Sequence, residues 1–168
     1  MFTPLYYLLS RVYLFKPGLQ LFCRCAGSGR VPRRHAARFK SDAQVRMHRF
    51  WHILQQNMQE FTTLRAALVE ENWLSDERLA VGGASMGGMT ALGIMARHPE
   101  VKCVASLMGS GYFTRLAQTL FPPLLVQTPE QQAEFDAVIA PLAEWDVTHQ
   151  LPRLADRPLL LWHGQDDD

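Results

Sequence analysis

The sequence predicts an α/β fold in which a parallel sheet carries helices on its faces. Residues 78–82, 102–108 and 157–162 are short apolar runs of the kind expected for buried parallel strands. Residues 86–97 are helix-forming types, and an insertion at about residues 109–150 separates the last two runs. This order of strand, helix, strand, insertion and strand is typical of a parallel sheet with crossover connections.

Composition supports one folded domain. The chain has 168 residues, of which 48% are hydrophobic. Its mean hydropathy is −0.10, a value that allows a buried core. Disordered and collagen-like classes are therefore excluded.

Charge is distributed unevenly along the chain. Residues 1–40 contain eight Lys and Arg and no acid, whereas residues 41–168 contain nine Lys and Arg against sixteen Asp and Glu. The basic residues lie among Gly, Ser and Pro without helical spacing, so we expect no nucleic-acid interface. We interpret residues 1–35 as an atypical basic segment, disordered or out of frame, with a transit peptide as the alternative. Residues 36–168 are interpreted as a partial domain.

The cysteines and the apolar runs bear on compartment and membrane. Cys23, Cys25 and Cys103 are an odd set, which provides neither a disulfide framework nor a four-ligand zinc site. We therefore predict a reducing, cytoplasmic setting and no metal or other cofactor. Arg11 and Lys16 interrupt the one apolar run that approaches bilayer length, so we predict no transmembrane helix.

A long amphipathic helix is predicted over about residues 43–71. Ser41 or Asp42 can serve as its N-cap, and apolar residues recur at helical spacing after it. These residues are Met47, Phe50, Trp51, Leu54, Met58, Phe61, Leu64 and Leu68.

Two shorter helices are predicted at residues 86–97 and 129–139. Pro99 cannot continue a helix, and the basic Arg97 suits a helix C-terminus, so the first of these ends there. The second lies in the insertion at 109–150, which mixes aromatic residues with prolines. We interpret that insertion as a helical cap.

The pattern Gly-Ala-Ser-Met-Gly at residues 83–87 lies where a predicted strand ends and a predicted helix begins. In this context G-x-S-x-G places a serine on a sharp turn with its hydroxyl clear of the sheet. The crowded turn requires small neighbours, here Gly83 and Gly87. Glycine-rich turns also cradle phosphates in nucleotide-binding folds, but the flanking strand and helix favour Ser85 as a catalytic nucleophile.

The residue after the serine is Met86. Its backbone N–H would lie at a helix N-terminus, where unpaired donors and the helix dipole stabilise a developing oxyanion. We therefore predict one oxyanion-hole donor from the backbone of Met86.

A serine nucleophile requires a histidine base and an acid that orients the base. Residues 166–168 are three aspartates after the third predicted strand, where catalytic groups gather in open α/β sheets, although a solvated acidic loop has the same composition. His163 is too close to these acids to be the base, and we expect it to pack or hydrogen-bond locally. The other histidines precede the acid, lie on helices or lie in the insertion: His35, His48, His52, His98 and His149. We therefore expect these 168 residues to lack the base.

Several sequence blocks in order carry a family resemblance. The blocks are residues 50–73, which begin with Phe50-Trp51, and residues 82–87, 108–113, 141–145 and 161–164. From about Ala36 onward the chain resembles small bacterial carboxylesterases of the dienelactone-hydrolase-like and prolyl-oligopeptidase-like branch of the α/β-hydrolases. The resemblance implies a partial α/β-hydrolase fold with a helical cap. It also implies hydrolysis of short-chain carboxylic esters through an acyl-enzyme on Ser85.

The resemblance also implies roles for further residues. Asp167 is implied as the triad acid, with Asp166 as the fallback, because family members carry an Asp three positions after the glycine of His-Gly. The cap would supply a substrate pocket from aromatic residues that could equally belong to the core: Tyr112, Phe113, Phe121 and Trp145.

Two parts of the family pattern are missing. Nothing before Ala36 resembles the His-Gly-Phe-like loop that donates the second oxyanion N–H, and the strand, catalytic histidine and closing helix that the family carries after the acid are not among these 168 residues. We expect a product truncated at both ends, inactive or nearly so, whose exposed sheet edges favour self-association. The alternatives are a serine peptidase of the same branch and a non-catalytic pseudo-enzyme fragment that pairs its sheet edge with a partner.

Overall fold

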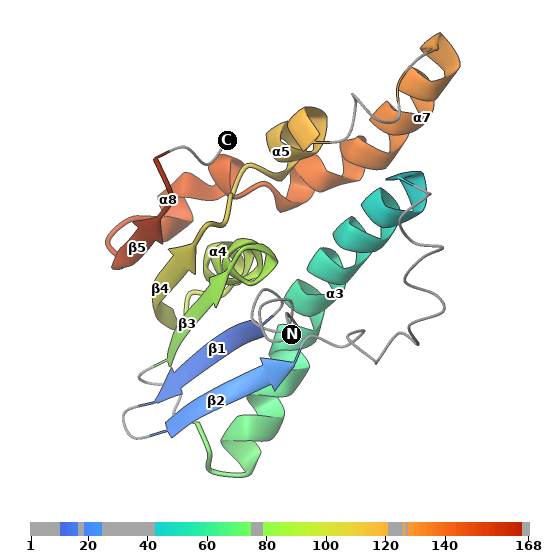
Figure 1. Cartoon of the computed structure of the whole chain (residues 1–168). Helices are drawn as coiled ribbons and strands as arrows, with labels where there is room; N and C mark the ends of the chain where they lie inside the picture. Colours follow the sequence, from blue (N-terminus) through green and yellow to red (C-terminus); the bar gives the residue numbers. More distant parts are fainter. Residues whose placement is uncertain are drawn as a thin grey trace, which may run out of the picture.

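The computed structural model describes residues 11–16, 19–24, 43–74, 79–120, 126 and 128–165 (Figure 1). The chain elements, in order, are β1 (Arg11–Lys16), β2 (Leu19–Arg24), α3 (Ala43–Glu70), β3 (Leu79–Ala84), α4 (Met86–Arg97), β4 (Val101–Leu107), α5 (Phe113–Leu120), α7 (Pro129–Ile139), the 3-10 helices η1 (Ala140–Trp145) and η2 (Val147–Gln150), α8 (Leu151–Leu154) and β5 (Leu159–Trp162). These elements confirm the predicted α/β class.

The described strands form one sheet in the order β2-β1-β3-β4-β5. β3, β4 and β5 are parallel, and their register aligns Ala84 with Leu107 and Leu107 with Trp162. The three carboxyl ends therefore lie side by side at one edge of the sheet. Ser85, Met108 and His163, which directly follow these strands, are brought to that edge.

β1 and β2 lie within residues 1–35, where the sequence analysis predicts no strand. The two strands pair with each other in antiparallel fashion, and β1 also pairs antiparallel with β3. The sequence interpretation missed them because their pairing depends on contacts with β3, which lies more than fifty residues further along the chain. The predicted boundary at residue 36 stays a prediction.

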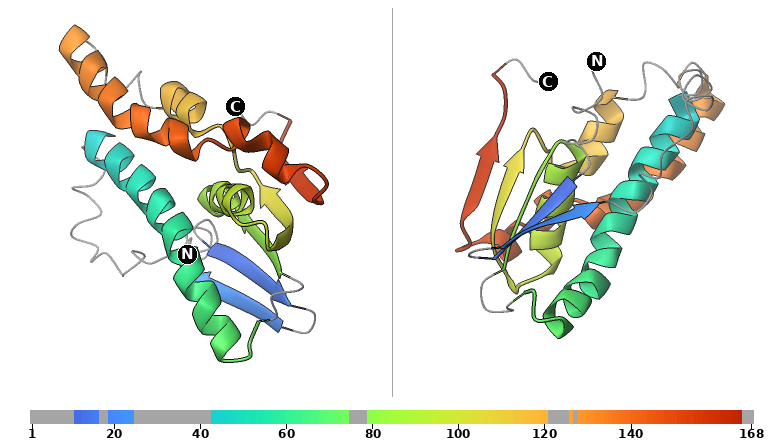
Figure 2. Two further views of the ribbon diagram at one scale, coloured as in Figure 1. Left: turned by 180° about the vertical axis from the view of Figure 1, so that it is seen from behind. Right: turned by 60° about the horizontal axis from the view of Figure 1, so that its bottom comes forward.

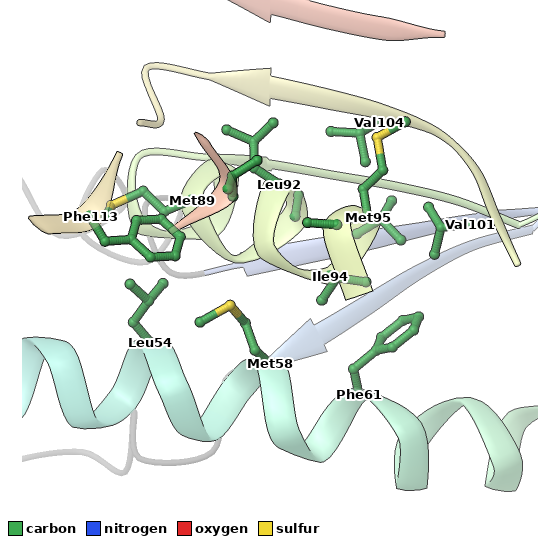
Figure 3. Packing of buried hydrophobic residues seen from close by; sticks show 14 of the residues in the cluster. Leu54, Met58, Phe61, Met89, Leu92, Ile94, Met95, Val101, Val104 and Phe113 are labelled. Carbon is green, nitrogen blue, oxygen red and sulfur yellow. The ribbon is translucent and has the colours of Figure 1, made fainter. Parts of the chain in front are cut away.

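The helices stack in layers beside the sheet. α4 packs on β3 and β4, and α3 packs on the outer side of α4 (Figure 2). Apolar side chains fill both contacts, with Leu54, Met58 and Phe61 of α3 on the side of Ile94 of α4, and with Met95 of α4 reaching toward Val104 of β4 (Figure 3). α4 is thus buried along most of its length, which fixes the helix that follows Ser85.

Gly93 allows α3 and α4 to approach closely. A Cβ atom at this position would lie 2.1 Å from the sulfur of Met58. The glycine therefore provides space for the methionine side chain, which is itself buried in the core. The helix tolerates the glycine because packing, rather than local propensity, holds this helix in place.

Arg157 closes the C-terminal end of α4. Its Nη1 donates to the carbonyls of His98 at 3.0 Å and Val101 at 2.9 Å, and its Nη2 donates to the carbonyl of Met95 at 2.7 Å. Carbonyls at the C-terminal end of a helix have no partner within the helix. A positive charge there is attracted to the negative end of the helix dipole. Arg157 therefore joins α4, β4 and the segment before β5.

Replacing Arg157 with alanine is expected to lower the free energy of unfolding by about 2 kcal/mol, because the carbonyls of Met95, His98 and Val101, and also that of Arg153, lose a charged donor. Urea denaturation of the full chain measures this. Arg115→Ala is the matched control, since Arg115 is exposed on α5 and should change stability by less than about 0.5 kcal/mol. Equal losses in both variants would show that Arg157 does not act as a cap.

Candidate active site

Ser85 lies alone between the end of β3 and the start of α4. Its backbone has φ 51° and ψ −121°, a region that residues other than glycine rarely occupy. Such strain costs on the order of 1–3 kcal/mol, so the surroundings must hold it. The Ser85 N–H donates to the carbonyl of Leu107 at 2.7 Å, and the Ser85 carbonyl accepts from Met89 N–H at 3.0 Å. β4 and the first turn of α4 therefore hold the turn from both sides.

The glycines around Ser85 are required by close backbone approach. A Cβ atom at Gly83 would lie 2.3 Å from the carbonyl carbon of Gly87, which is backbone and cannot move aside. A Cβ atom at Gly88 would lie 2.7 Å from Oγ of Ser106. The chain can turn this sharply from strand to helix only because these positions have no side chain.

Met86 is the first residue of α4. The first N–H groups of a helix lack helical acceptors, so its N–H is available near the serine hydroxyl. Its side chain packs against the apolar core, so only its backbone can serve at the site. The geometry suits the donor role that the sequence predicts for Met86.

Asp146 anchors the loop after β4, and the sequence analysis missed it. Its carboxylate is fully buried and accepts from the N–H of Phe113, the N–H of Thr114 and the hydroxyl of Thr114. Next to it, Val147 N–H donates to the carbonyl of Gly111 at 2.9 Å. The contacts cross more than thirty residues of sequence, so no local pattern could have found them. They fix the loop that runs beside the first turn of α4.

His163 follows β5 at the same edge as Ser85. Its Nε2 lies 3.0 Å from the carbonyl of Gly109, to which it donates. This hydrogen bond joins the end of β5 to the loop after β4, 54 residues earlier in the sequence. A nitrogen that donates to a carbonyl is not positioned to accept a proton from a serine.

The four predicted pocket residues separate in the structure. Phe113 is fully buried beside Trp51, with ring centroids 6.4 Å apart, so it belongs to the core. Trp145 lies under the guanidinium of Arg97, the last residue of α4, and thus at the opposite end of that helix from Ser85. Tyr112 is 45% exposed on the loop after β4. Phe121, Asp166 and Asp167 lie outside the described residues.

Two general findings accompany this geometry. Within the part of the chain that the structure describes, no cluster of three or more His, Cys, Asp or Glu could bind a metal ion. None of the described helices combines the length and apolar character needed to cross a bilayer.

Strand, strained serine and buried helix together form the nucleophile elbow that defines an α/β-hydrolase. The model of the prolyl oligopeptidase family matches residues 51–168. Over 134 residues the chain is 68% identical to "Esterase YjfP" of Escherichia coli (strain K12), covering 80% of this chain and 54% of that protein. Over 123 residues it is 31% identical to "Putative esterase YitV" of Bacillus subtilis (strain 168), covering 70% of this chain and 48% of that protein. No solved structure matches the chain.

The chain belongs to the prolyl oligopeptidase family of α/β-hydrolases, because the family match extends over most of its residues. This confirms the family resemblance inferred from the sequence blocks. The chain spans about half the length of the relatives it matches.

Gly83→Ala is expected to lower the free energy of unfolding by about 3 kcal/mol, because the new methyl group would overlap the backbone of Gly87. Thermal or urea unfolding measures the loss. Ala84→Gly, at the neighbouring residue, should cost only about 1 kcal/mol through added backbone freedom. A Gly83→Ala protein as stable as the parent would contradict the tight turn.

Asp146→Ala is expected to lower the free energy of unfolding by about 3 kcal/mol, because one buried donor, from Phe113, and two part-buried donors, from Thr114, lose their acceptor. Urea denaturation provides the measurement. Asp136→Ala is the control, since Asp136 is exposed on α7 and accepts a single hydrogen bond from Gln132. If the two variants lost equal stability, Asp146 would not anchor the loop.

Proposed function

We propose that this chain carries the nucleophile part of a serine carboxylesterase that hydrolyses short-chain esters. The observation that carries the proposal is the strained backbone of Ser85 at the meeting point of β3 and α4. Two relatives named as esterases support the substrate class.

In the proposed reaction, Ser85 Oγ attacks the ester carbonyl and its proton passes to a histidine base. The carbonyl oxygen becomes an oxyanion that accepts a hydrogen bond from Met86 N–H. The ester C–O bond breaks, and the alcohol leaves with the proton from the histidine. Water then hydrolyses the acyl-enzyme and releases the acid. No cofactor takes part in these steps.

The proposed reaction also needs a histidine base and an acid that orients it. We assign the acid to Asp167, with Asp166 as the fallback, because both come after β5 in the sequence and the family resemblance implies an Asp three positions after the glycine of His-Gly. Among the described histidines, none hydrogen-bonds to Ser85, and His163 is engaged with Gly109. We therefore propose that these 168 residues alone hydrolyse esters very slowly. The three cysteines of the sequence favour a reducing, cytoplasmic setting.

A chimaera tests the mechanism. Residues 36–168 are joined to the parts of Esterase YjfP that extend beyond the aligned region, and the protein is treated with a fluorophosphonate probe. We expect covalent labelling at Ser85, and hydrolysis of p-nitrophenyl acetate at least about 1000-fold faster than by the 168 residues alone, because the base and a second oxyanion donor are restored.

Two variants of the chimaera are the controls. Ser85→Ala should abolish labelling and turnover, whereas Ser110→Ala, on the loop after β4, should leave labelling intact. Labelling that survives in Ser85→Ala and disappears in Ser110→Ala would assign the nucleophile elsewhere.

A serine peptidase is the second candidate, favoured by the family match itself. The same nucleophile would attack a peptide carbonyl, and the leaving group would be an amine. Cleavage of peptide substrates by the chimaera, with no hydrolysis of short esters, would select the peptidase over the esterase.

A non-catalytic fragment that self-associates is the third candidate. The side chains of β5, residues 159–162, are all 40–59% exposed. Beside them, an apolar surface cavity of about 430 Å³ lies over β3, β4 and β5. Exposed strands with apolar side chains pair readily with other chains. Analytical ultracentrifugation of the full chain would detect the expected dimers or larger species, and a monomer at all concentrations would rule this candidate out.

A further inference from the structure

A second cavity lies at the C-terminal end of α4, away from Ser85. Its volume is about 580 Å³, and its lining comes from the end of α4, from η1 and η2, and from α8. α4 has 12 residues and Ser85 precedes its first, so the two ends are roughly 18 Å apart at the usual helical rise. A ligand in this cavity would therefore not overlap a substrate on Ser85.

The lining of the cavity is predominantly basic. Arg97, Arg153 and His149 face a single acid, Glu144. In the part of the chain that the structure describes, neither arginine forms an ion pair with a carboxylate. Burial lowers the pKa of Arg97, Glu144 opposes that shift, and the nearby Arg153 lowers the pKa further. The two guanidinium groups are therefore close enough to repel each other. Glu144 is the one carboxylate in the cavity lining that offsets their positive charge.

The basic groups are held in place by other contacts. The Arg97 guanidinium lies 3.9 Å from the centre of the Trp145 ring, and its Nη2 donates to the Glu144 carbonyl at 2.8 Å. Its Nη1 is buried and has no acceptor among the described residues. His149 Nδ1 donates to the Ala143 carbonyl at 3.1 Å. Little side-chain freedom would be lost on binding a ligand, which favours affinity.

Arg153 is held on the opposite wall. Its Nη1 donates to Oε1 of Gln150 at 3.4 Å, and its backbone carbonyl accepts from Nη2 of Arg157. Arg157 also caps α4, so the position of Arg153 is tied to the end of the helix that carries Arg97. The backbone of Arg153 is therefore joined, through Arg157, to the end of the helix that carries Arg97.

We propose that this cavity is a binding site for a small oxyanion, a phosphate or carboxylate group, which lies between Arg97 and Arg153 with His149 at its side. A guanidinium offers paired N–H donors that match the oxygens of such groups. A bound anion would supply the negative charge that Glu144 alone does not provide. It would also join α4 to η2 and α8, which should stabilise the folded chain.

Titration of inorganic phosphate into the full chain, with chloride at equal ionic strength as the reference, tests the site. We expect saturable binding in a calorimeter and a rise in Tm that chloride does not produce. Parallel titration with acetate distinguishes the two sources, because preference for phosphate indicates a phosphate-bearing ligand and preference for acetate indicates a carboxylate. Equal effects of phosphate, acetate and chloride would overturn the proposal.

Two variants with opposite expected effects give a sharper test. Arg153→Gln should weaken binding about tenfold, because a charged donor is lost. Glu144→Gln should strengthen binding about two- to fivefold, because the one repelling charge is removed. Arg115→Gln, which removes an equal charge from exposed α5, should bind as the parent does.

These variants remove the ambiguity of a misfolded protein, since one of them is expected to gain affinity. Unchanged affinity in both Arg153→Gln and Glu144→Gln would overturn the proposal. Equal weakening in Arg153→Gln and Arg115→Gln would do the same, because it would show a response to net charge alone.

Discussion

The backbone at Ser85 is held in a conformation that a serine does not adopt without compensation. Its φ of 51° is stable because the amide on one side bonds to β4 and the carbonyl on the other side bonds into α4. The same conformation lifts the hydroxyl out of the sheet and leaves the first N–H groups of α4 beside it. The strain, the proposed position of the nucleophile and the proposed oxyanion donor thus all depend on one turn.

The rest of the described fold keeps that turn in place. α4 cannot shift, because α3 packs on its outer side, β3 and β4 on its inner side, and Arg157 closes its end. The loop after β4 is equally fixed, by the buried carboxylate of Asp146. Both anchors connect distant parts of the chain, so the elbow depends on tertiary contacts rather than on its own five residues.

Local signals explain which elements could be predicted from the sequence. The helix Met86–Arg97 has its predicted bounds, because the elbow begins it and Pro99 prevents its continuation. Pro129–Ile139 also matches, and Thr128 and Gln131 form a capping box at its start. The third parallel strand begins two residues later than predicted, because Arg157 turns back to cap α4.

Contacts between distant residues explain what could not be predicted. β1 is ordered by pairing with β3, and nothing within its own sequence reports that partner. Aromatic character alone could not separate Phe113, which fills the core, from Tyr112, which remains exposed one residue earlier. Nothing in the sequence indicates that the ring of Trp145 packs on Arg97, at the opposite end of α4 from Ser85.

An experimental structure at a resolution that defines backbone dihedrals tests the central claim most directly. We expect Ser85 at a positive φ near 51°, with its N–H bonded to the Leu107 carbonyl and its hydroxyl outside the core. A continuous helix through residue 85, or a Ser85 side chain packed in the interior, would contradict the elbow and every role derived from it.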